Sequence, residues 1–199
     1  MTPDEFRKRI LIDSTETMLN EILLSDEAKH VSPDQIIYIK KKLSEKFNVP
    51  IDIIKLIVVG SAKLGFSISE KKLKDKSSLS RYRAFGPASD IDIAIVCQPI
   101  FEKIWNELTQ YSFSVPFAPW QSTKFGDYLV CGWIRPDHFP KRVRLRKCDD
   151  WWDTFRLLSS KQVLGRRTIR AGLYYNMEQL KIYQSKALTE CKNYERLQK

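Results

Sequence analysis

Two short stretches decide the fold: IIKLIVVGSAKLG at residues 53–65 and SDIDIAIV at residues 89–96. The first begins with a β-branched run, which predicts a buried strand that ends at Gly60. The second alternates acidic and apolar residues at its start. Asp90 and Asp92 therefore share one face of a strand, because side chains two residues apart point the same way. We expect two strands, one ending and one beginning in residues that suit polar chemistry.

Capping signals and helical periodicity predict helices around these strands. Thr2 and Ser32 are each followed by a proline and, three residues after the cap, by Glu5 or Gln35, which is the pattern of a capping box. The expected helices cover residues 3–23, 33–47, 100–111, about 149–158 and about 167–190. The expected strands cover residues 53–59, 89–96, about 125–134 and 142–146. Residues 69–84 are expected to form a charged helix or a mobile loop.

This pattern is typical of a mixed α+β fold, with helices flanking a small sheet. At 199 residues and 43% hydrophobic, the chain fits one domain over residues 1–199. We expect N-terminal helices over 1–47, a sheet core over 53–147 and C-terminal helices over 149–190.

The composition favours a cytoplasmic protein with an anionic partner. The formal net charge is +10, with 34 Lys and Arg against 24 Asp and Glu, which suits nucleotide phosphates or nucleic acid, although an inert basic surface would have the same charge. The basic stretch 69–84 either contacts phosphate or nucleic acid, or forms a solvated surface loop without a binding role. The four cysteines are widely spaced and do not form a zinc set. The N-terminus does not resemble a signal peptide, and the apolar runs are too short to cross a membrane.

The acids at 90 and 92 and the glycine-serine turn at 60–61 together suggest phosphate chemistry. Two carboxylates on one strand repel each other unless a cation lies between them, and Mg²⁺ prefers oxygen ligands that substrate phosphates complete. A strand that ends in Gly60-Ser61 presents backbone N–H groups and a hydroxyl to an anion. Taken alone, each element has a plain reading: two solvated acids on an edge strand, or an ordinary strand-to-helix turn. Together and in this order they are more specific.

The two stretches IVVGSAKLG at 57–65 and SDIDIAIV at 89–96 resemble the nucleotidyltransferase superfamily. The resemblance implies a small nucleotidyltransferase-type sheet, a triphosphate held by Gly60 and Ser61, and Mg²⁺ (or Mn²⁺) held by Asp90 and Asp92. The other two residues assigned to the nucleotide site are Lys63 and Gly65. The resemblance also implies a third carboxylate on a later strand.

The third carboxylate is not obvious in the sequence. Asp127, expected at a strand entry, is the first candidate metal ligand, and Asp137 is the second. The expected strand VRLR at 143–146 offers arginines where an acid would be sought, and arginine suits the gripping of a triphosphate. If neither acid reaches the site, the protein works with two carboxylates or has lost catalysis.

Other residues have two readings each. Arg166, Arg167 and Arg170 belong to a solvated helix face or to the rim of the cleft. A nucleotide base could stack on an aromatic side chain, for which Tyr82, Trp120 and Tyr128 are candidates, although most aromatic residues here are expected in the core.

The leading hypothesis is transfer of a nucleoside monophosphate from an NTP or dNTP to an acceptor hydroxyl, with release of pyrophosphate. Three acceptors are open. The first is another nucleotide, which gives an oligonucleotide signal as in bacterial anti-phage defence. The others are a nucleic-acid end, or a protein or small molecule as in toxin-type enzymes. A partner protein that supplies recognition fits the short chain. The alternative is a non-catalytic nucleotide- or nucleic-acid-binding module of the same fold.

Overall fold

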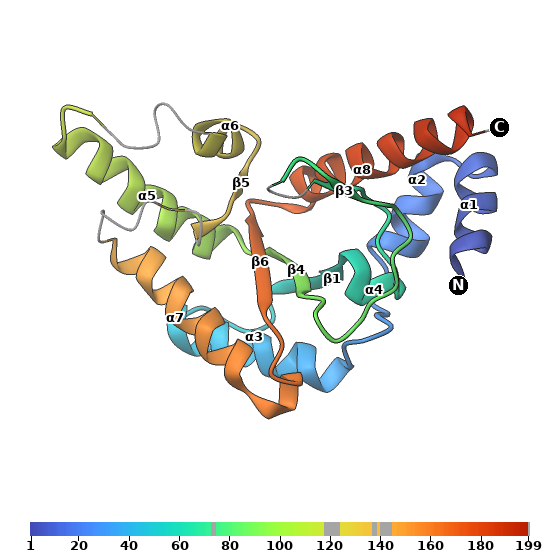
Figure 1. Ribbon diagram of the computed structural model, residues 1–199. Helices are drawn as coiled ribbons and strands as arrows, with labels where there is room; N and C mark the ends of the chain where they lie inside the picture. The colour runs from blue at the N-terminus through green and yellow to red at the C-terminus, as the bar shows by residue number, and fades with distance from the viewer. Residues whose placement is uncertain (73–74, 118–123, 137–138, 140–144, 199) are drawn as a thin grey trace.

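The computed structural model describes residues 1–72, 75–117, 124–136, 139 and 145–198, and confirms a mixed α+β fold (Figure 1). The helices are α1 (Pro3–Ile12), α2 (Thr15–Met18), a π-helical turn (Leu19–Leu23), α3 (Pro33–Phe47), α4 (Gly60–Leu64), α5 (Gln98–Ser114), α6 (Lys124–Val130), α7 (Arg146–Ser160), a 3₁₀ turn (Gln162–Leu164) and α8 (Met177–Leu197). The strands are β1 (Lys55–Val59), β2 (Lys71–Lys72), β3 (Ser78–Leu79), β4 (Ile91–Val96), β5 (Trp133–Ile134) and β6 (Ile169–Tyr174).

The main sheet has four strands in the order β1-β4-β6-β5. Strand β4 runs antiparallel to β1 and parallel to β6, and the short β5 is antiparallel to β6. Strand β4, which contains Asp92 and begins directly after Asp90, therefore lies inside the sheet, between β1 and β6. Its first residues lie beside the end of β1 and the start of β6.

The expected helix over residues 167–190 is wrong in its first part. Residues 169–174 form β6, and the helix begins only at Met177. Ile169, Ala171 and Leu173 are buried on one face of β6, and the parallel pairing with β4 satisfies its backbone groups. Asn176 then caps α8 by accepting hydrogen bonds from the first backbone N–H groups. The sheet core consequently extends to Tyr174, beyond the expected boundary at residue 147.

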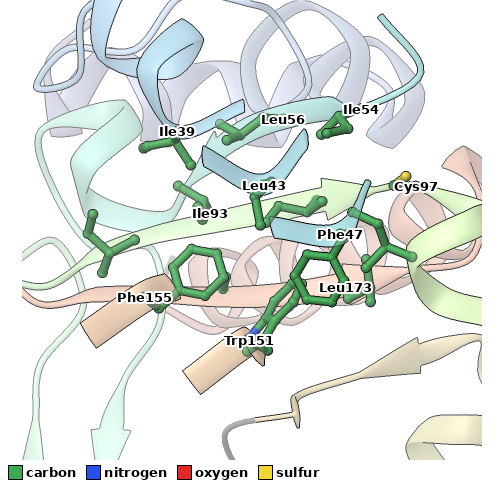
Figure 2. Packing of buried hydrophobic residues seen from close by; sticks show 14 of the residues in the cluster. Ile39, Leu43, Phe47, Ile54, Leu56, Ile93, Cys97, Trp151, Phe155 and Leu173 are labelled. Atoms are coloured by element: carbon green, nitrogen blue, oxygen red, sulfur yellow. The ribbon is translucent and has the colours of Figure 1, made fainter. Parts of the chain in front are cut away.

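The first face of the sheet carries the main hydrophobic core. Figure 2 shows Ile93 and Leu173 of the sheet packed among Leu43 of α3 and Trp151 of α7. Helices α3 and α7 lie side by side beneath this face (Figure 1). The capping box predicted at Ser32 is present, and α3 begins as the sequence indicates.

The second face of the sheet is different, because its residues change from charged to small to bulky along the strands. It is covered in part by α8, whose Leu180 packs with Ala94 and Tyr174. The register pairs on this face, in order along β4 and β6, are Asp92 with Arg170, Ala94 with Gly172, and Val96 with Tyr174. The small middle pair lets the Trp133 indole lie close over Gly172, where a Cβ atom would be only 2.6 Å from its Nε1.

Three further expectations need correction. The first helix breaks at Asp13, where the backbone is extended, and Ser14 caps a new helix. The strand expected at 125–134 is instead helix α6, a turn at Gly132, which has positive φ, and the two-residue β5. The strand expected at 142–146 falls largely outside the described residues, and residue 146 already belongs to α7.

The basic stretch 69–84 contains a short hairpin, β2 and β3, rather than a helix. Its arginines brace the segment from within: Arg81 donates to the carbonyl of Ile68, and Arg83 donates to the carbonyl of Leu79 at 2.8 Å. Among the described residues, no helix has the length and apolar character needed to cross a membrane.

Candidate active site

The end of β1 and the start of β4 meet at one edge of the second sheet face. Val59 is the register partner of Asp92, so the turn that follows β1 lies directly beside that carboxylate. Gly60 has a φ of +64°, and a Cβ atom placed on it would lie 3.3 Å from Asp92 Oδ2. Glycine is needed here because of its backbone conformation and because of this close approach.

Arg170 lies beside the two acids, on the neighbouring strand β6. It is the register partner of Asp92, and its Nε donates to Asp90 Oδ2 at 2.7 Å. The arginine side chain is half exposed, so this ion pair contributes about 0.2–1 kcal/mol. The resemblance implies a third carboxylate on a later strand. The later strand that lies beside Asp92 is β6, and it carries an arginine, Arg170, at this position.

The first candidate for the third acid is not at the site. Asp127 lies in the first turn of helix α6, exposed to solvent, and not at a strand entry. Asp137 lies outside the described residues. Within the described ranges, no three His, Cys, Asp or Glu side chains gather into a group that would hold a metal ion. Among the residues that the structure describes, the acidic part of the site is Asp90 and Asp92.

Asp92 has an unfavourable environment for its negative charge. Burial raises the pKa of its carboxyl, and the neighbouring charge of Asp90 raises it further. The positive charges of Arg170, Arg135 and Lys71 oppose this rise in the pKa of Asp92. The Asp92 carboxyl is thus half-buried, beside one acid and three cations. A bound cation, or a change in the position of Arg170, would therefore shift the pKa of Asp92.

A pocket of about 320 Å³ opens on this face, and we call it the Asp92 pocket. Its floor is the sheet, at Asp92, Ala94 and Gly172. Helix α8 forms one wall with Tyr183 and Gln184, and the remaining lining includes Gly60, Trp133, Arg135 and Arg170. Its volume is near the lower end of the range of about 300–1,000 Å³ for small-molecule sites. The pocket therefore combines a charged end at the two arginines with an aromatic end.

Lys63 and Gly65, both assigned to the nucleotide site from the sequence, have other positions. The Lys63 ammonium donates to the backbone carbonyls of Ser25 and Glu27, and burial lowers the pKa of Lys63 to about 8. Gly65 ends α4 in the left-handed conformation, with its N–H bonded to the Ser61 carbonyl. Neither residue lines the Asp92 pocket, and both hold the segment after β1 in place.

Ser61 lies next to Gly60 in α4 and is half-buried. The pocket is lined by Gly60 and not by Ser61. The structure thus brings the glycine of the motif to Asp92, while the serine occupies the following helical position.

The three arginines at 166, 167 and 170 have three different environments. Arg170 is at the site, and Arg166 is exposed. Arg167 supports the loop before Asp90, because its Nη1 donates to the carbonyls of Gly86 at 2.7 Å, Pro87 at 3.1 Å and Ser89 at 3.2 Å. Its guanidinium also lies over the ring of Phe85, 4.7 Å from the centroid.

Sequence reasoning missed Trp133, Tyr183 and Gln184 as site residues. Tyr183 and Gln184 were expected in a helix. Which face of that helix meets the sheet depends on strand β6, and β6 was not predicted. Trp133 follows Gly132 in an apolar run that reads as core. A glycine before a tryptophan was the available signal for a tight turn that places an aromatic ring.

Comparison of the chain with protein-family models, with curated proteins and with solved structures yields no match. The resemblance to nucleotidyltransferases therefore rests on the residues at 57–65 and 89–96.

Proposed function

We propose that this protein is a metal-dependent nucleotidyltransferase that transfers a nucleoside monophosphate from an NTP or dNTP to an acceptor hydroxyl. The observation that carries the proposal is that Gly60, Asp92 and Arg170 line one pocket together with Arg135, while Asp90 is ion-paired with Arg170 beside it. Carboxylates that can hold a cation and guanidinium groups that can hold phosphate therefore lie close together at this pocket.

The donor set at Asp90 and Asp92 fits Mg²⁺ or Mn²⁺. Both offer carboxylate oxygens, Asp92 from β4 and Asp90 from the position just before it, and the raised pKa of Asp92 reflects a carboxylate whose charge a cation would stabilise. When bound, the ion supplies charge neutralisation at the phosphates and orientation of the reacting oxygens. Asp90 is paired with Arg170, so metal loading requires Arg170 to move from Asp90 to a phosphate oxygen, which it can contact through the same N–H groups.

In the proposed reaction, the acceptor oxygen forms a bond to the α-phosphorus while the bond to pyrophosphate breaks. The hydroxyl proton leaves to solvent. Arg135 and Arg170 hold the phosphates, and Gly60 allows the backbone to approach them closely. The acceptor is a second nucleotide, a nucleic-acid end, or a hydroxyl of a protein or small molecule. We favour a nucleotide acceptor and an oligonucleotide product, since the Asp92 pocket is of small-molecule size.

Product analysis tests this proposal. Purified protein is incubated with labelled NTPs and dNTPs and Mg²⁺ or Mn²⁺, with pyrophosphate release and mass spectrometry of the products as readouts. We expect turnover in the wild type and in Asp127→Asn, and none in the Asp90→Asn/Asp92→Asn double variant. Turnover that survives the double variant would refute the proposal.

A second candidate function is a non-catalytic nucleotide-binding module. The Arg170–Asp90 ion pair favours it, because an arginine in place of a third acid suits the binding of a phosphate more than that of a second cation. Nucleotide binding without turnover under either metal, weakened in Arg170→Ala, would identify this function.

A further inference from the structure

The end of the Asp92 pocket away from the acids is built from aromatic rings. Trp133 lies with its ring centroid 4.7 Å from that of Tyr183, 4.2 Å from that of Tyr128 and 6.0 Å from that of Tyr174. Below these rings, the Ala94–Gly172 register pair is the smallest on this sheet face. Because Trp133 covers Gly172, a flat, bulky group in the pocket would lie against the rings of Trp133 and Tyr183.

Two polar groups at this end make no hydrogen bond within the described ranges. The indole Nε1 of Trp133 is buried and makes no hydrogen bond within the described part of the chain. Gln184 lines the pocket from α8 with only 9% of its surface exposed, and its amide has no hydrogen bond to any described residue. Buried polar groups are nearly always hydrogen-bonded, so the Trp133 Nε1 is an exception, whereas the Gln184 amide is accessible to a group in the pocket.

The chemistry of these groups specifies the occupant. The Gln184 amide offers one acceptor and two donors in a plane, which matches a planar group that presents a donor and an acceptor on one edge. Nucleobases present such edges, and aromatic side chains stack on their faces.

The position of this end fits the same ligand. Successive residues of a strand rise by about 3.3 Å, so the Ala94–Gly172 pair lies about 7 Å from the Asp92–Arg170 pair along the sheet. A nucleotide with its phosphates at Arg170 and Asp92 would reach this end with its base.

We infer that the aromatic end of the Asp92 pocket is a nucleobase subsite, in which Gln184 reads the base edge and Trp133 and Tyr183 contact the ring. This inference rests on the proposed function for the position of the phosphates. The ligand it names is a single nucleotide, in which Gln184 prefers one base among the four.

The test compares ligands with and without a base. Calorimetric titration measures the binding of ATP, GTP, CTP and UTP and of inorganic tripolyphosphate, in the presence of Mg²⁺, to the wild type, Gln184→Leu and Gln198→Leu. Gln198 lies exposed at the end of α8 and provides the same chemical change away from the pocket.

We expect the wild type to bind at least one nucleoside triphosphate at least about tenfold more tightly than tripolyphosphate. Gln184→Leu should weaken that nucleotide about three- to tenfold, as for a lost hydrogen bond, and leave tripolyphosphate unchanged. Gln198→Leu should match the wild type. Thermal unfolding of each variant confirms folding, and Tyr183→Leu provides a second probe of the same wall, with the same expectation.

The inference is overturned if tripolyphosphate binds as tightly as every nucleotide, if Gln184→Leu weakens both ligands equally, or if no ligand binds. The proposed function fails separately, through turnover that does not depend on Asp90 and Asp92. Base-dependent binding with no turnover would therefore support the subsite and identify the non-catalytic module.

Discussion

The floor of the Asp92 pocket gives a prediction that can be worked from distances. Gly172 has a backbone conformation that alanine can adopt, but a Cβ atom there would lie 2.6 Å from Trp133 Nε1 and 3.3 Å from Tyr174 Cε2. The indole cannot shift freely, because the rings of Tyr128 and Tyr183 lie against it. Gly172→Ala therefore forces rearrangement of the aromatic end.

The magnitude follows from two opposing effects. Overpacking of a well-packed site costs about 1–3 kcal/mol. Replacing a strand glycine by alanine recovers about 0.5–1 kcal/mol. We expect Gly172→Ala to lower the free energy of unfolding by about 1–2 kcal/mol, and the Tm by about 2–4 °C for each kcal/mol in a chain of this size.

Gly86→Ala is the matched control. A Cβ atom at Gly86 meets nothing within 4 Å among the described residues, so this variant should be neutral or more stable by about 0.4–1 kcal/mol. Urea denaturation followed by circular dichroism measures both variants. A Gly172→Ala protein as stable as the wild type would show that Trp133 does not lie over the sheet as described.

Three further predictions concern the charged residues. Arg167→Ala removes the hydrogen bonds to the loop before Asp90 and should lower the free energy of unfolding by about 2–3 kcal/mol, as measured by denaturation. It should also reduce turnover, as measured by pyrophosphate release. Unchanged stability would contradict this role of Arg167. Lys63 has a pKa of about 8, below its ordinary value, so the unfolded state binds more protons between pH 8 and 10.5, and wild-type stability should rise over that window relative to Lys63→Met; parallel pH profiles of the two proteins would refute this. Asp92→Asn should reduce turnover by more than about 100-fold yet raise the Tm at pH 7, because it removes a half-buried charge whose pKa is raised by burial and by Asp90; a lower Tm would contradict the electrostatic account.

Local signals in the sequence predicted the elements that local interactions determine. The capping boxes at Thr2 and Ser32 are both present, and the strands at 55–59 and 91–96 lie within the expected ranges. The alternation of buried Ile91 and Ile93 with Asp92 was readable, because alternation is a property of the strand alone, whereas Asp90 lies just before β4 and not in it.

The parts that depend on distant contacts were not predicted. Residues 169–174 become a strand by pairing with β4, more than seventy residues upstream, and Arg170 reaches Asp90 only through that pairing. Lys63 follows Gly60-Ser61 and resembles a phosphate ligand in sequence, but carbonyls of the loop at 25–27 bind its ammonium. Asp127 was sought at a strand entry, whereas its segment is helical.

The most direct test of the central claim is calorimetric titration of a non-hydrolysable nucleoside triphosphate analogue, with and without Mg²⁺. The account predicts binding to the wild type that Mg²⁺ strengthens, and an affinity in the Asp90→Asn/Asp92→Asn variant that no longer responds to Mg²⁺. Binding that is identical in both proteins, with or without the metal, would contradict it.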